Sequence, residues 1–418
     1  MLMRVRRHPK LLGVVVGAAV ASLCLVTLGM WWSGDDGPTP LPHHHRHALD
    51  GMNVSQFIDS PRQLILEPRR ALEACGGGGG GGGKGKAGDG GVEVLLLVPS
   101  SPNNLAARSA VRESWGAYLP ANWALVFYVG AVDRESVQKD LAAEAQAHQD
   151  IAQDVTFIDS YSNLTLKTLA LLSWAHQACP TTSFVFKVDD DVYVNVPKLH
   201  GLVSCLNAAI WNVYKEKRRR GDSHSQDKNC EGVRSLVSYY TDAKNHRYES
   251  YVLAGYLYRD IKPYRDPTSK WYVPKTSFPR EVLPPFLSGT AYLMSINIIP
   301  HLLNGARNTP AIALEDVYLT GLVASEQLKL RLSKLEGIDR FRPRWQSACA
   351  YKTTLTAHGF TPGELRGTTH MALAVANDAC DGVFTRVGLA LNRIVTSLFP
   401  RLPSSSSLLD SADVSVTI

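Results

Sequence analysis

Three consecutive carboxylates follow an apolar run in the middle of the chain, and their types and spacing point to chemistry. The run 184–188 is rich in β-branched and aromatic side chains, which is typical of a buried strand, and Asp189, Asp190 and Asp191 come directly after it. Open α/β sheets bind ligands outside the carboxyl ends of their strands. Because carboxylate oxygens suit Mg²⁺ or Mn²⁺, the cluster predicts a metal site. A solvated acidic turn is the alternative interpretation.

A second acidic pair, Glu315-Asp316, follows another apolar run nearer the C-terminus. Such a pair is also common at the start of a helix, where carboxylates are favoured. Together with the first cluster it indicates a division of roles. One set of carboxylates would hold a metal ion, and the other would carry out acid–base chemistry.

The elements that must position these acids alternate along the chain. Apolar runs predict strands at 92–98, 124–129, 155–158 and 184–188, and helical spacing predicts helices at 135–149, 169–179 and 199–213. A further helix, capped by Asn103 or Asn104, would carry Arg108 and Arg112. This alternation predicts an α/β fold with a mostly parallel central sheet.

The chain after Tyr239 is crowded with tyrosine, proline and tryptophan, as in Lys270-Trp271-Tyr272-Val273-Pro274. We expect it to be irregular but ordered. Aromatic faces beside polar groups would suit a sugar, and aromatic core packing is the ordinary alternative.

The N-terminal segment is typical of a membrane anchor. Four basic residues within 1–10 precede an uncharged run over 11–32, which is long enough to cross a bilayer as a helix. A cleaved signal peptide is the alternative, but the run is long and ends in the bulky Trp31-Trp32 pair, where small residues are needed. The positive-inside rule places residues 1–10 in the cytosol and the rest of the chain in the lumen.

Residues 33–91 are predicted to be a flexible stem, because they contain spaced prolines and an unbroken glycine run from Gly76 to Gly83. Their histidine cluster is interpreted as solvated. Lys84 and Lys86 are not followed by the hydroxyl residue of a phosphate loop. A catalytic domain is predicted for 92–365, and a partly disordered C-terminal extension for 366–418.

Composition narrows the class of protein. The net charge of +6 is partly concentrated at the N-terminus and near 217–220, so it does not predict a nucleic-acid partner. Six of the seven cysteines lie outside the anchor and lack C-x-x-C spacing. This argues against zinc and permits disulfides in an oxidising compartment, with the pairing open. The sequons at Asn53 and Asn163 predict glycosylation.

The motifs and their order resemble glycosyltransferase family 31, the β-1,3-galactosyltransferases and β-1,3-N-acetylglucosaminyltransferases of the Golgi. The resemblance covers roughly 92–365. Ser114 stands where threonine is usual, and Tyr193 where phenylalanine is usual. The matching blocks are 108–115, 144–168, 187–195, 255–289, 315–321 and 349–364.

The resemblance implies a GT-A fold, a UDP-sugar donor, Mn²⁺ and inversion at the anomeric carbon. It implies that Asp191 and His358 bind Mn²⁺ and that Asp316 is the general base on the acceptor hydroxyl. Asp189 and Asp190 would contact the ribose or the water shell of the metal. The remaining implied roles are nucleotide binding by Arg108 and Arg112, and acceptor binding by Trp271, Tyr272 and Glu315.

The sequence therefore predicts a single-pass type II Golgi membrane enzyme. It would transfer a hexose, with galactose favoured, from a UDP-sugar in β-1,3 linkage to a glycan on a glycoprotein or glycolipid. The alternatives are an N-acetylglucosaminyltransferase using UDP-GlcNAc, a catalytically silent carbohydrate-binding membrane protein, and a metal-dependent hydrolase of UDP-sugars. Donor and acceptor identity stay open.

Overall fold

The computed structural model describes residues 49, 51–76, 91–218, 230, 232–241, 248–343, 345–375, 378–380 and 388–391. All of them lie in one unit, Arg46–Ile418. The predicted anchor at 11–32, residues 33–48 and 77–90 of the predicted stem, and the chain after 391 lie outside the described residues. No helix among the described residues is both long enough and apolar enough to cross a membrane.

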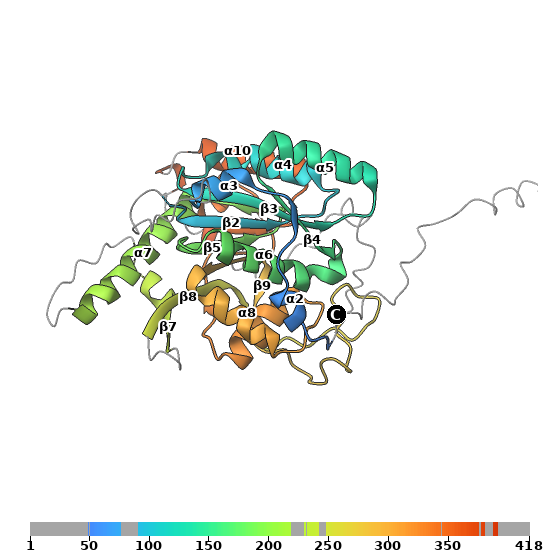
Figure 1. The fold of residues 1–418 in the computed structure, drawn as a ribbon. Coiled ribbons are helices and arrows are strands. Elements are labelled where there is room, and N and C mark those ends of the chain that lie inside the picture. Colours follow the sequence, from blue (N-terminus) through green and yellow to red (C-terminus); the bar gives the residue numbers. More distant parts are fainter. Residues whose placement is uncertain are drawn as a thin grey trace, which may run out of the picture. The chain divides into compact units, whose positions relative to one another are not determined.

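A mixed β-sheet forms the centre of this unit (Figure 1). Four parallel strands lie side by side in the order β4 (Ile151–Ile158), β3 (Trp123–Ala131), β2 (Val94–Pro99) and β5 (Phe184–Val188). Every residue of β2 and β5 is buried, as their apolar runs predicted. The parallel arrangement expected for the first half of the chain is confirmed.

The second half of the sheet differs from the prediction. Strand β9 (Phe286–Ser295) pairs antiparallel with β5, β8 (Tyr248–Tyr258) antiparallel with β9, and β7 (Val237–Thr241) antiparallel with β8. A short strand, β10 (Ser333–Lys334), pairs parallel with β8. The region expected to be irregular thus supplies strands. It was missed because strands buried on both faces show no polar–apolar alternation.

Helices cover both faces of the sheet (Figure 1). Leu95 and Leu97 of β2 pack into one layer of the core, and Leu96 between them packs into the other, as alternate strand side chains must. The first layer contains α6 (Leu164–Ala178), α8 (Ile299–Arg307) and the π-helix η7 (Val317–Gln327). The second contains α4 (Leu105–Glu113), α5 (Glu135–His148), α7 (Val196–Arg218) and α10 (Pro362–Ala374).

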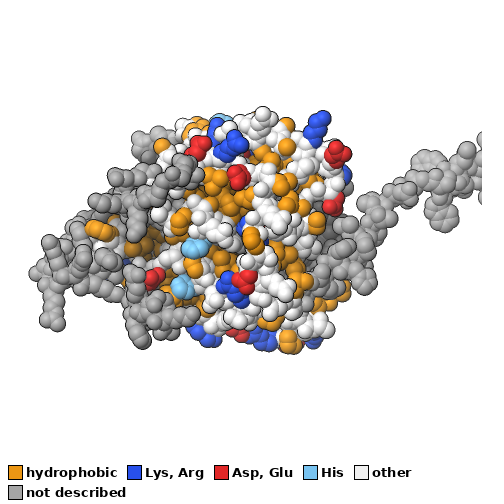
Figure 2. Space-filling model, viewed as in Figure 1, with side chains coloured by type: hydrophobic (Ala, Val, Ile, Leu, Met, Phe, Trp, Pro, Cys, Tyr) orange, Lys and Arg blue, Asp and Glu red, His pale blue; other side chains and the backbone are white. Residues whose placement is uncertain are grey.

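Shorter elements complete the described fold. Strand β6 (Val192–Val194) pairs antiparallel with β11 (Thr356–His358) in a separate two-stranded sheet. The short helices are α9 (Ala348–Thr353), η2 (Trp115–Tyr118), η3 (Tyr161–Asn163), η5 (Val233–Leu236), η6 (Ile296–Ile298) and η8 (Asp378–Cys380). On the face shown in Figure 2, charged side chains of both signs are scattered among apolar ones and do not form a basic patch.

Part of the predicted stem is folded onto the sheet, which differs from the expected boundary at residue 92. This part comprises α2 (Ser55–Asp59), β1 (Leu64–Leu66) and α3 (Arg69–Ala74). Strand β1 pairs antiparallel with β4, and a disulfide joins Cys75 to Cys179 at the end of α6. A three-residue strand is too short to show a period in the sequence, so this docking was not visible there.

The expected boundary at Leu365 also differs from the structure. Helix α10 continues to Ala374, and Arg366 on it pairs with Glu113 of α4. A disulfide joins Cys349 to Cys380, beyond the predicted end of the domain. The remaining disulfide joins Cys205 to Cys230.

Candidate active site

The acidic triplet stands where the central strand β5 ends. The N–H of Asp189 donates to Thr290 O of β9 at 3.0 Å, so the first acid still belongs to the sheet ladder. One turn later, Trp115 Nε1 donates to Val192 O at 2.9 Å and fixes the start of β6. The three acids are therefore held between two anchored strands, and each is only partly exposed.

Strand β11 brings His358 to Asp191. In the β11–β6 pairing His358 lies opposite Val192, and the N–H groups of Gly359 and Phe360 donate to Asp191 O at 3.2 and 3.0 Å. As a result, His358 Nε2 lies 3.2 Å from Asp191 Oδ2.

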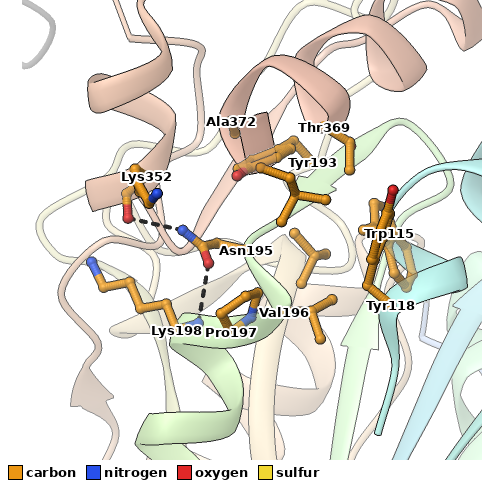
Figure 3. A pocket seen from close by; sticks show the side chains of 12 residues that line it. Trp115, Tyr118, Tyr193, Asn195, Val196, Pro197, Lys198, Lys352, Thr369 and Ala372 are labelled. Carbon is orange, nitrogen blue, oxygen red and sulfur yellow. Dashed lines mark hydrogen bonds between the residues drawn. The ribbon is translucent and has the colours of Figure 1, made fainter. Parts of the chain in front are cut away.

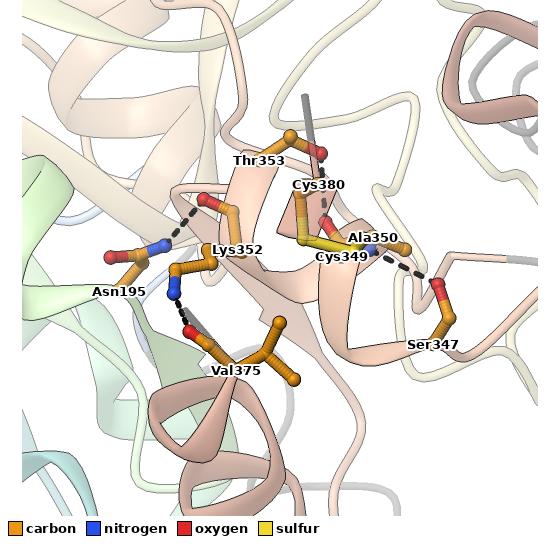
Figure 4. Close-up of a disulfide and its surroundings, with 8 residues drawn as sticks. All are labelled: Asn195, Ser347, Cys349, Ala350, Lys352, Thr353, Val375 and Cys380. Carbon is orange, nitrogen blue, oxygen red and sulfur yellow. Dashed lines mark hydrogen bonds between the residues drawn. A yellow bond between two sulfur atoms is a disulfide. The ribbon is translucent and has the colours of Figure 1, made fainter. Parts of the chain in front are cut away.

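Helix α9, which leads into β11, is itself held at both ends (Figure 4). The Ser347 side chain caps its first turn by accepting from Ala350 N at 3.2 Å. The Cys349–Cys380 disulfide fastens it, and Lys352 Nζ donates to Val375 O at the end of α10. The position of His358 is thus set by several contacts around α9.

Asp189, Asp191 and His358 form a group that could hold a metal ion. One possible ligand atom from each lies within 4.8 Å of the others. Two carboxylate oxygens and an imidazole nitrogen are a donor set that suits Mn²⁺. The sequence prediction placed Asp191 and His358 on the metal, and the geometry adds Asp189 to the same group.

The carboxylates of this cluster crowd negative charge into a partly buried place, which favours binding of a cation. Burial, together with Asp191, raises the pKa of Asp189, and burial raises the pKa of Asp190 to about 6. Burial also acts on Asp191, but His358 beside it holds the pKa of Asp191 below its usual value. Burial lowers the pKa of His358, and Asp191 more than offsets this, so the net shift is upward. Since a metal binds neutral imidazole, metal binding here would be coupled to loss of that proton.

Lys187 links the two acidic motifs. Its Nζ lies 2.7 Å from Asp189 Oδ1 and 3.2 Å from Glu315 Oε1, and it also donates to Gly289 O. The contact with Glu315 is an ion pair that lacks hydrogen-bond geometry at Oε1. Burial lowers the pKa of Lys187, but the two carboxylates raise it further, so the ammonium stays charged.

Asp316 is held by backbone N–H groups. Gly289 N donates to its Oδ2 at 2.9 Å, and Val317 N donates to its Oδ1 at 2.8 Å. Burial raises the pKa of Asp316 in spite of these bonds. A rigidly held carboxylate of raised basicity is what a general base requires. Asp316 directly precedes the π-helix η7, and π-helices are frequent at functional sites.

Residue 289 must be glycine for the acids to approach β9 this closely. A Cβ placed there would lie 2.9 Å from Glu315 Oε1 and 3.3 Å from Asp316 Oδ2. Real Cβ atoms do not show contacts as short as the first, so any side chain at 289 would displace the buried Glu315.

Glu315 lies inside the site and is not open to an acceptor. It is 7% exposed, and Tyr292 Oη donates to its Oε2 at 3.4 Å. Burial raises the pKa of Glu315 to about 7, although Lys187 lowers it. The Glu315 carboxylate is therefore enclosed by Tyr292 and Lys187, whereas the predicted acceptor contact requires an open side chain.

Trp271 and Tyr272 lie in a loop on the side of His358. Trp271 is 39% exposed, with its ring centroid 5.4 Å from that of Tyr264. Lys270 Nζ lies 4.8 Å above the Trp271 ring, and its charge is among those acting on the pKa of His358. The loop thus offers an open aromatic face beside the metal-ligand group.

Two tyrosines that the sequence prediction did not assign lie close enough to Asp316 for its charge to act on their pKa. Tyr161 of η3 is 55% exposed, and its partial burial, with the charge of Asp316 adding, raises its pKa to about 12. Burial also raises the pKa of Tyr258, with Asp316 again contributing and Arg340 opposing. Tyr161 lies within 144–168, one of the blocks that match the family, and this match was the sequence signal that could have identified it as a site residue.

Arg108 and Arg112 face the protein interior. Arg108 is completely buried, and it bonds Glu144, Ser100 Oγ and the carbonyls of Ser101 and Pro102. Arg112 bonds Glu144 and Asp150. The structure does not bring either guanidinium to the open side of the acid cluster, where a nucleotide contact was expected.

The two sequons differ in their surroundings. Asn53 is exposed on the docked N-terminal segment. Asn163 is half-buried, and its Nδ2 donates to Ile158 O at 2.9 Å. Thr165 of the same sequon is buried, and its Oγ1 donates to Ile312 O at 2.7 Å. Glycosylation at both sites stays a prediction.

A cavity of about 420 Å³ lies beside β6, and none of the site acids lines it (Figure 3). Its central polar side chain, Asn195, donates to the carbonyls of Tyr351 and Lys352 and accepts from Lys198 N. Because these groups bond the protein itself, we assign this cavity no part in the chemistry.

Comparison with known proteins gives one family. Residues 106–228 and 232–336 match a family model described as Galactosyltransferase. The chain is 33% identical over 286 residues to beta-1,3-galactosyltransferase 4 of Mus musculus, covering 65% of this chain and 70% of that protein. It is 31% identical over 277 residues to beta-1,3-galactosyltransferase 5 of Homo sapiens, covering 65% and 76%. Among solved structures, a mannosyltransferase from Pyrobaculum calidifontis in complex with GDP-Man and Mn2+ is 12% identical, with a TM-score of 0.27 over 88% of each chain.

Proposed function

The chain belongs to the galactosyltransferase family whose model it matches over more than half of its length, and on this premise we propose that it transfers galactose from UDP-galactose to a glycan hydroxyl in β-1,3 linkage. The expected membership of family 31 is thereby confirmed, and with it an enzyme of galactosyltransferase type. The donor, the linkage and the residue roles given below are our proposal. The relatives named beta-1,3-galactosyltransferase support the choice of galactose.

The observation that carries the proposal is the pairing of a metal-ligand group with a rigid carboxylate. Asp189, Asp191 and His358 converge at the end of β5, and Lys187 connects them to Glu315 beside Asp316. We propose that the first three residues hold Mn²⁺. When bound, Mn²⁺ supplies the charge neutralisation that a departing diphosphate needs. Placing the acids at the carboxyl end of the central strand also supports a GT-A arrangement.

Asp316 is the proposed base. Its carboxylate takes the proton of the acceptor hydroxyl as the hydroxyl oxygen attacks the anomeric carbon. The N–H groups of Gly289 and Val317 donate to this carboxylate and hold it in one orientation. Attack from the side of Asp316, with the diphosphate leaving on the side of the metal ligands, gives inversion.

The open aromatic side chains are the proposed acceptor surface. Trp271, Tyr264 and Tyr161 are all exposed and come from two different segments of the chain. The charge of Asp316 acts on the pKa of Tyr161, and the charge of Lys270, whose Nζ lies above the Trp271 ring, acts on the pKa of His358. The C–H faces of a sugar ring pack well against such rings. This supports a saccharide acceptor on a glycoprotein or glycolipid.

We propose that the enzyme is anchored in the Golgi membrane with its domain in the lumen. The apolar run at 11–32 supports the anchor. The three disulfides among the described residues support an oxidising compartment, since such bonds are rare in the cytosol. Resistance of the domain to protease in sealed vesicles would agree with this topology, and digestion without detergent would contradict it.

A donor panel tests the proposed function. The purified protein is incubated with Mn²⁺, simple saccharide acceptors, and UDP-galactose, UDP-GlcNAc or UDP-glucose in separate reactions. We expect a new disaccharide from UDP-galactose. If product forms only from UDP-GlcNAc, the transferred sugar is N-acetylglucosamine and not galactose. Hydrolysis without transfer, or binding without turnover, would contradict a transferase.

A further inference from the structure

We propose that Ser100 is a positioning residue for the nucleotide donor, because its buried hydroxyl fixes Asp190 from a loop that two buried cations hold in place. The inference rests on the proposed function, and it takes for Asp190 the contact with the ribose of the nucleotide that the family resemblance implies. Ser100 follows strand β2 directly and is 3% exposed. Its Oγ donates to Asp190 Oδ2 at 2.7 Å.

The loop between β2 and α4 is clamped through three successive carbonyl groups. Lys167 Nζ donates to Ser100 O at 2.9 Å, and the Arg108 guanidinium donates to the carbonyls of Ser101 and Pro102. Both cations are buried, at 2% and 0% exposure. Hydrogen bonds from charged donors are stronger than neutral ones, so this loop is held firmly although it has no regular structure.

Each cation also has an acidic partner that keeps it in place. Lys167 Nζ lies 2.6 Å from Asp159 Oδ2, and Arg108 Nη2 lies 2.6 Å from Glu144 Oε2. These partners come from the end of β4 and from α5. Lys167 itself lies on α6 and Arg108 on α4, which cover opposite faces of the sheet, so the loop is tied to both layers.

Arg108 has no donor left for a ligand. A guanidinium has five N–H bonds. Two of them reach Glu144, two reach the carbonyls of Ser101 and Pro102, and the fifth reaches Ser100 Oγ at 3.1 Å. Any effect of Arg108 on the donor must pass through this loop.

The bond from Arg108 also orients the Ser100 hydroxyl. An oxygen that accepts from a guanidinium must point its own hydrogen elsewhere. The carboxylate of Asp190, at 2.7 Å, is a better acceptor than Ser101 O at 3.5 Å. Arg108 thereby sets the direction in which Ser100 donates.

Both donors to Asp190 bond the same oxygen atom. Asn104 Nδ2, which is exposed, donates to Oδ2 at 2.9 Å alongside Ser100. Within the described part of the chain, Oδ1 accepts no hydrogen bond. The carboxylate is thus held by one oxygen and presents the other to a hydroxyl group of the donor.

Calorimetric titration of UDP into the full-length protein with Mn²⁺ tests this arrangement. We expect Ser100→Ala to weaken UDP binding about tenfold, since a buried hydrogen bond to a charged group is lost. The KM for the UDP-sugar should rise by a similar factor, with kcat and the acceptor KM nearly unchanged. Ser100→Thr retains the hydroxyl and should recover most of the affinity.

Ser114→Ala is the matched control. Ser114 is also a completely buried serine at the opposite end of α4, and its Oγ donates at 3.4 Å only to Val111 O. It should bind UDP like the wild type. Asn104→Ala removes the exposed donor from the same carboxylate oxygen and should weaken UDP binding by a smaller factor. Thermal unfolding of each variant reports whether it is folded.

Several results would overturn the inference. UDP affinity within twofold of wild type in folded Ser100→Ala would do so, and so would equal weakening in Ser114→Ala. If Ser100→Ala does not fold, an unchanged affinity in Asn104→Ala contradicts the positioning of Asp190. A wild type that binds UDP, is weakened by Ser100→Ala and yet transfers no sugar supports this inference and overturns the proposed transferase. A wild type that binds no UDP overturns both.

Discussion

Lys187 Nζ lies 2.7 Å from Asp189 Oδ1, and this ion pair between a buried lysine and a partly exposed carboxylate joins the two acidic motifs of the chain. The same ammonium lies 3.2 Å from Glu315 Oε1, beside the proposed base. Lys187 thus lies near the end of β5, two residues before the first acid of the triplet. Because of that spacing, the metal-ligand group and the base belong to one site.

Replacing Lys187 by methionine is expected to destabilise the protein. Two largely enclosed carboxylates would lose their shared cation, and breaking a buried pair in this way costs about 3–5 kcal/mol of unfolding free energy. Urea titration measures this loss. Lys334→Met is the control. Lys334 is 60% exposed and its partner Glu336 is 80% exposed, and exposed ion pairs of this kind contribute about 0–1 kcal/mol of unfolding free energy. Equal losses in the two variants would contradict the linking role of Lys187.

Removal of Asp191 or His358, two of the three proposed metal ligands, is expected to abolish the Mn²⁺ dependence of donor binding. Asp191→Ala and His358→Ala should each bind UDP equally weakly with Mn²⁺ and with a chelator, whereas the wild type should lose affinity only when chelator is added. Calorimetry with UDP makes the comparison. His370→Ala, on the exposed side of α10, is the control histidine. Wild-type Mn²⁺ dependence in His358→Ala would remove His358 from the metal site.

Asp316→Asn is expected to lower transfer by about 10²–10⁴-fold, the usual contribution of a general base. UDP binding should stay close to that of the wild type, because the proposed base acts on the acceptor and not on the nucleotide. One of the N–H groups of Gly289 and Val317 would face the new amide, so thermal unfolding must accompany the kinetics. Turnover at the wild-type rate would show that another group is the base.

The raised pKa of Glu315 predicts a pH-dependent stability. Burial raises the pKa of Glu315 to about 7 in the folded protein from 4.5, with Lys187 opposing and Asp316 and Asp189 adding to the rise. The folded state therefore binds this proton more tightly than the unfolded chain does. The resulting stabilisation is complete below the unfolded pKa and is lost as the pH rises through about 7.

Unfolding free energies of wild type and Glu315→Gln at several pH values measure this effect. The wild type should lose stability relative to the variant between pH 4.5 and 7. Subtracting the two curves removes the contribution of other groups. Glu336→Gln, which removes an exposed carboxylate, should run parallel to the wild type. A constant difference between wild type and Glu315→Gln would contradict the shift.

Strands β2, β3 and β5 of the parallel half could be predicted because each contains a continuous apolar run. Only 155–158 of β4 was predicted, because Gln153 and Asp154 interrupt its apolar run. The antiparallel strands β8 and β9 could not, since their tyrosines and glycines show no period, and Tyr251 and Tyr292 are core residues there. The docking of β1 and the disulfide at Cys75 depend on contacts with β4 and α6, far away in the sequence.

The acids of the site could be predicted from their places at the ends of apolar runs. The meeting of His358 with Asp191 depends on the register of β11 against β6, which no local pattern encodes. Arg108 misled the prediction in a different way. The family resemblance implied nucleotide binding by this residue. Only the folded structure shows that Glu144, the carbonyls of Ser101 and Pro102, and Ser100 Oγ use all five of its donors.

The most direct test of the central claim is proton NMR of the product that the purified protein forms from UDP-galactose and a saccharide acceptor, with Mn²⁺ and again with chelator. The account predicts a galactose in β linkage to O3 of the acceptor, formed only with the metal and not by Asp316→Asn. An α-linked product, or galactose released as the free sugar, would contradict it.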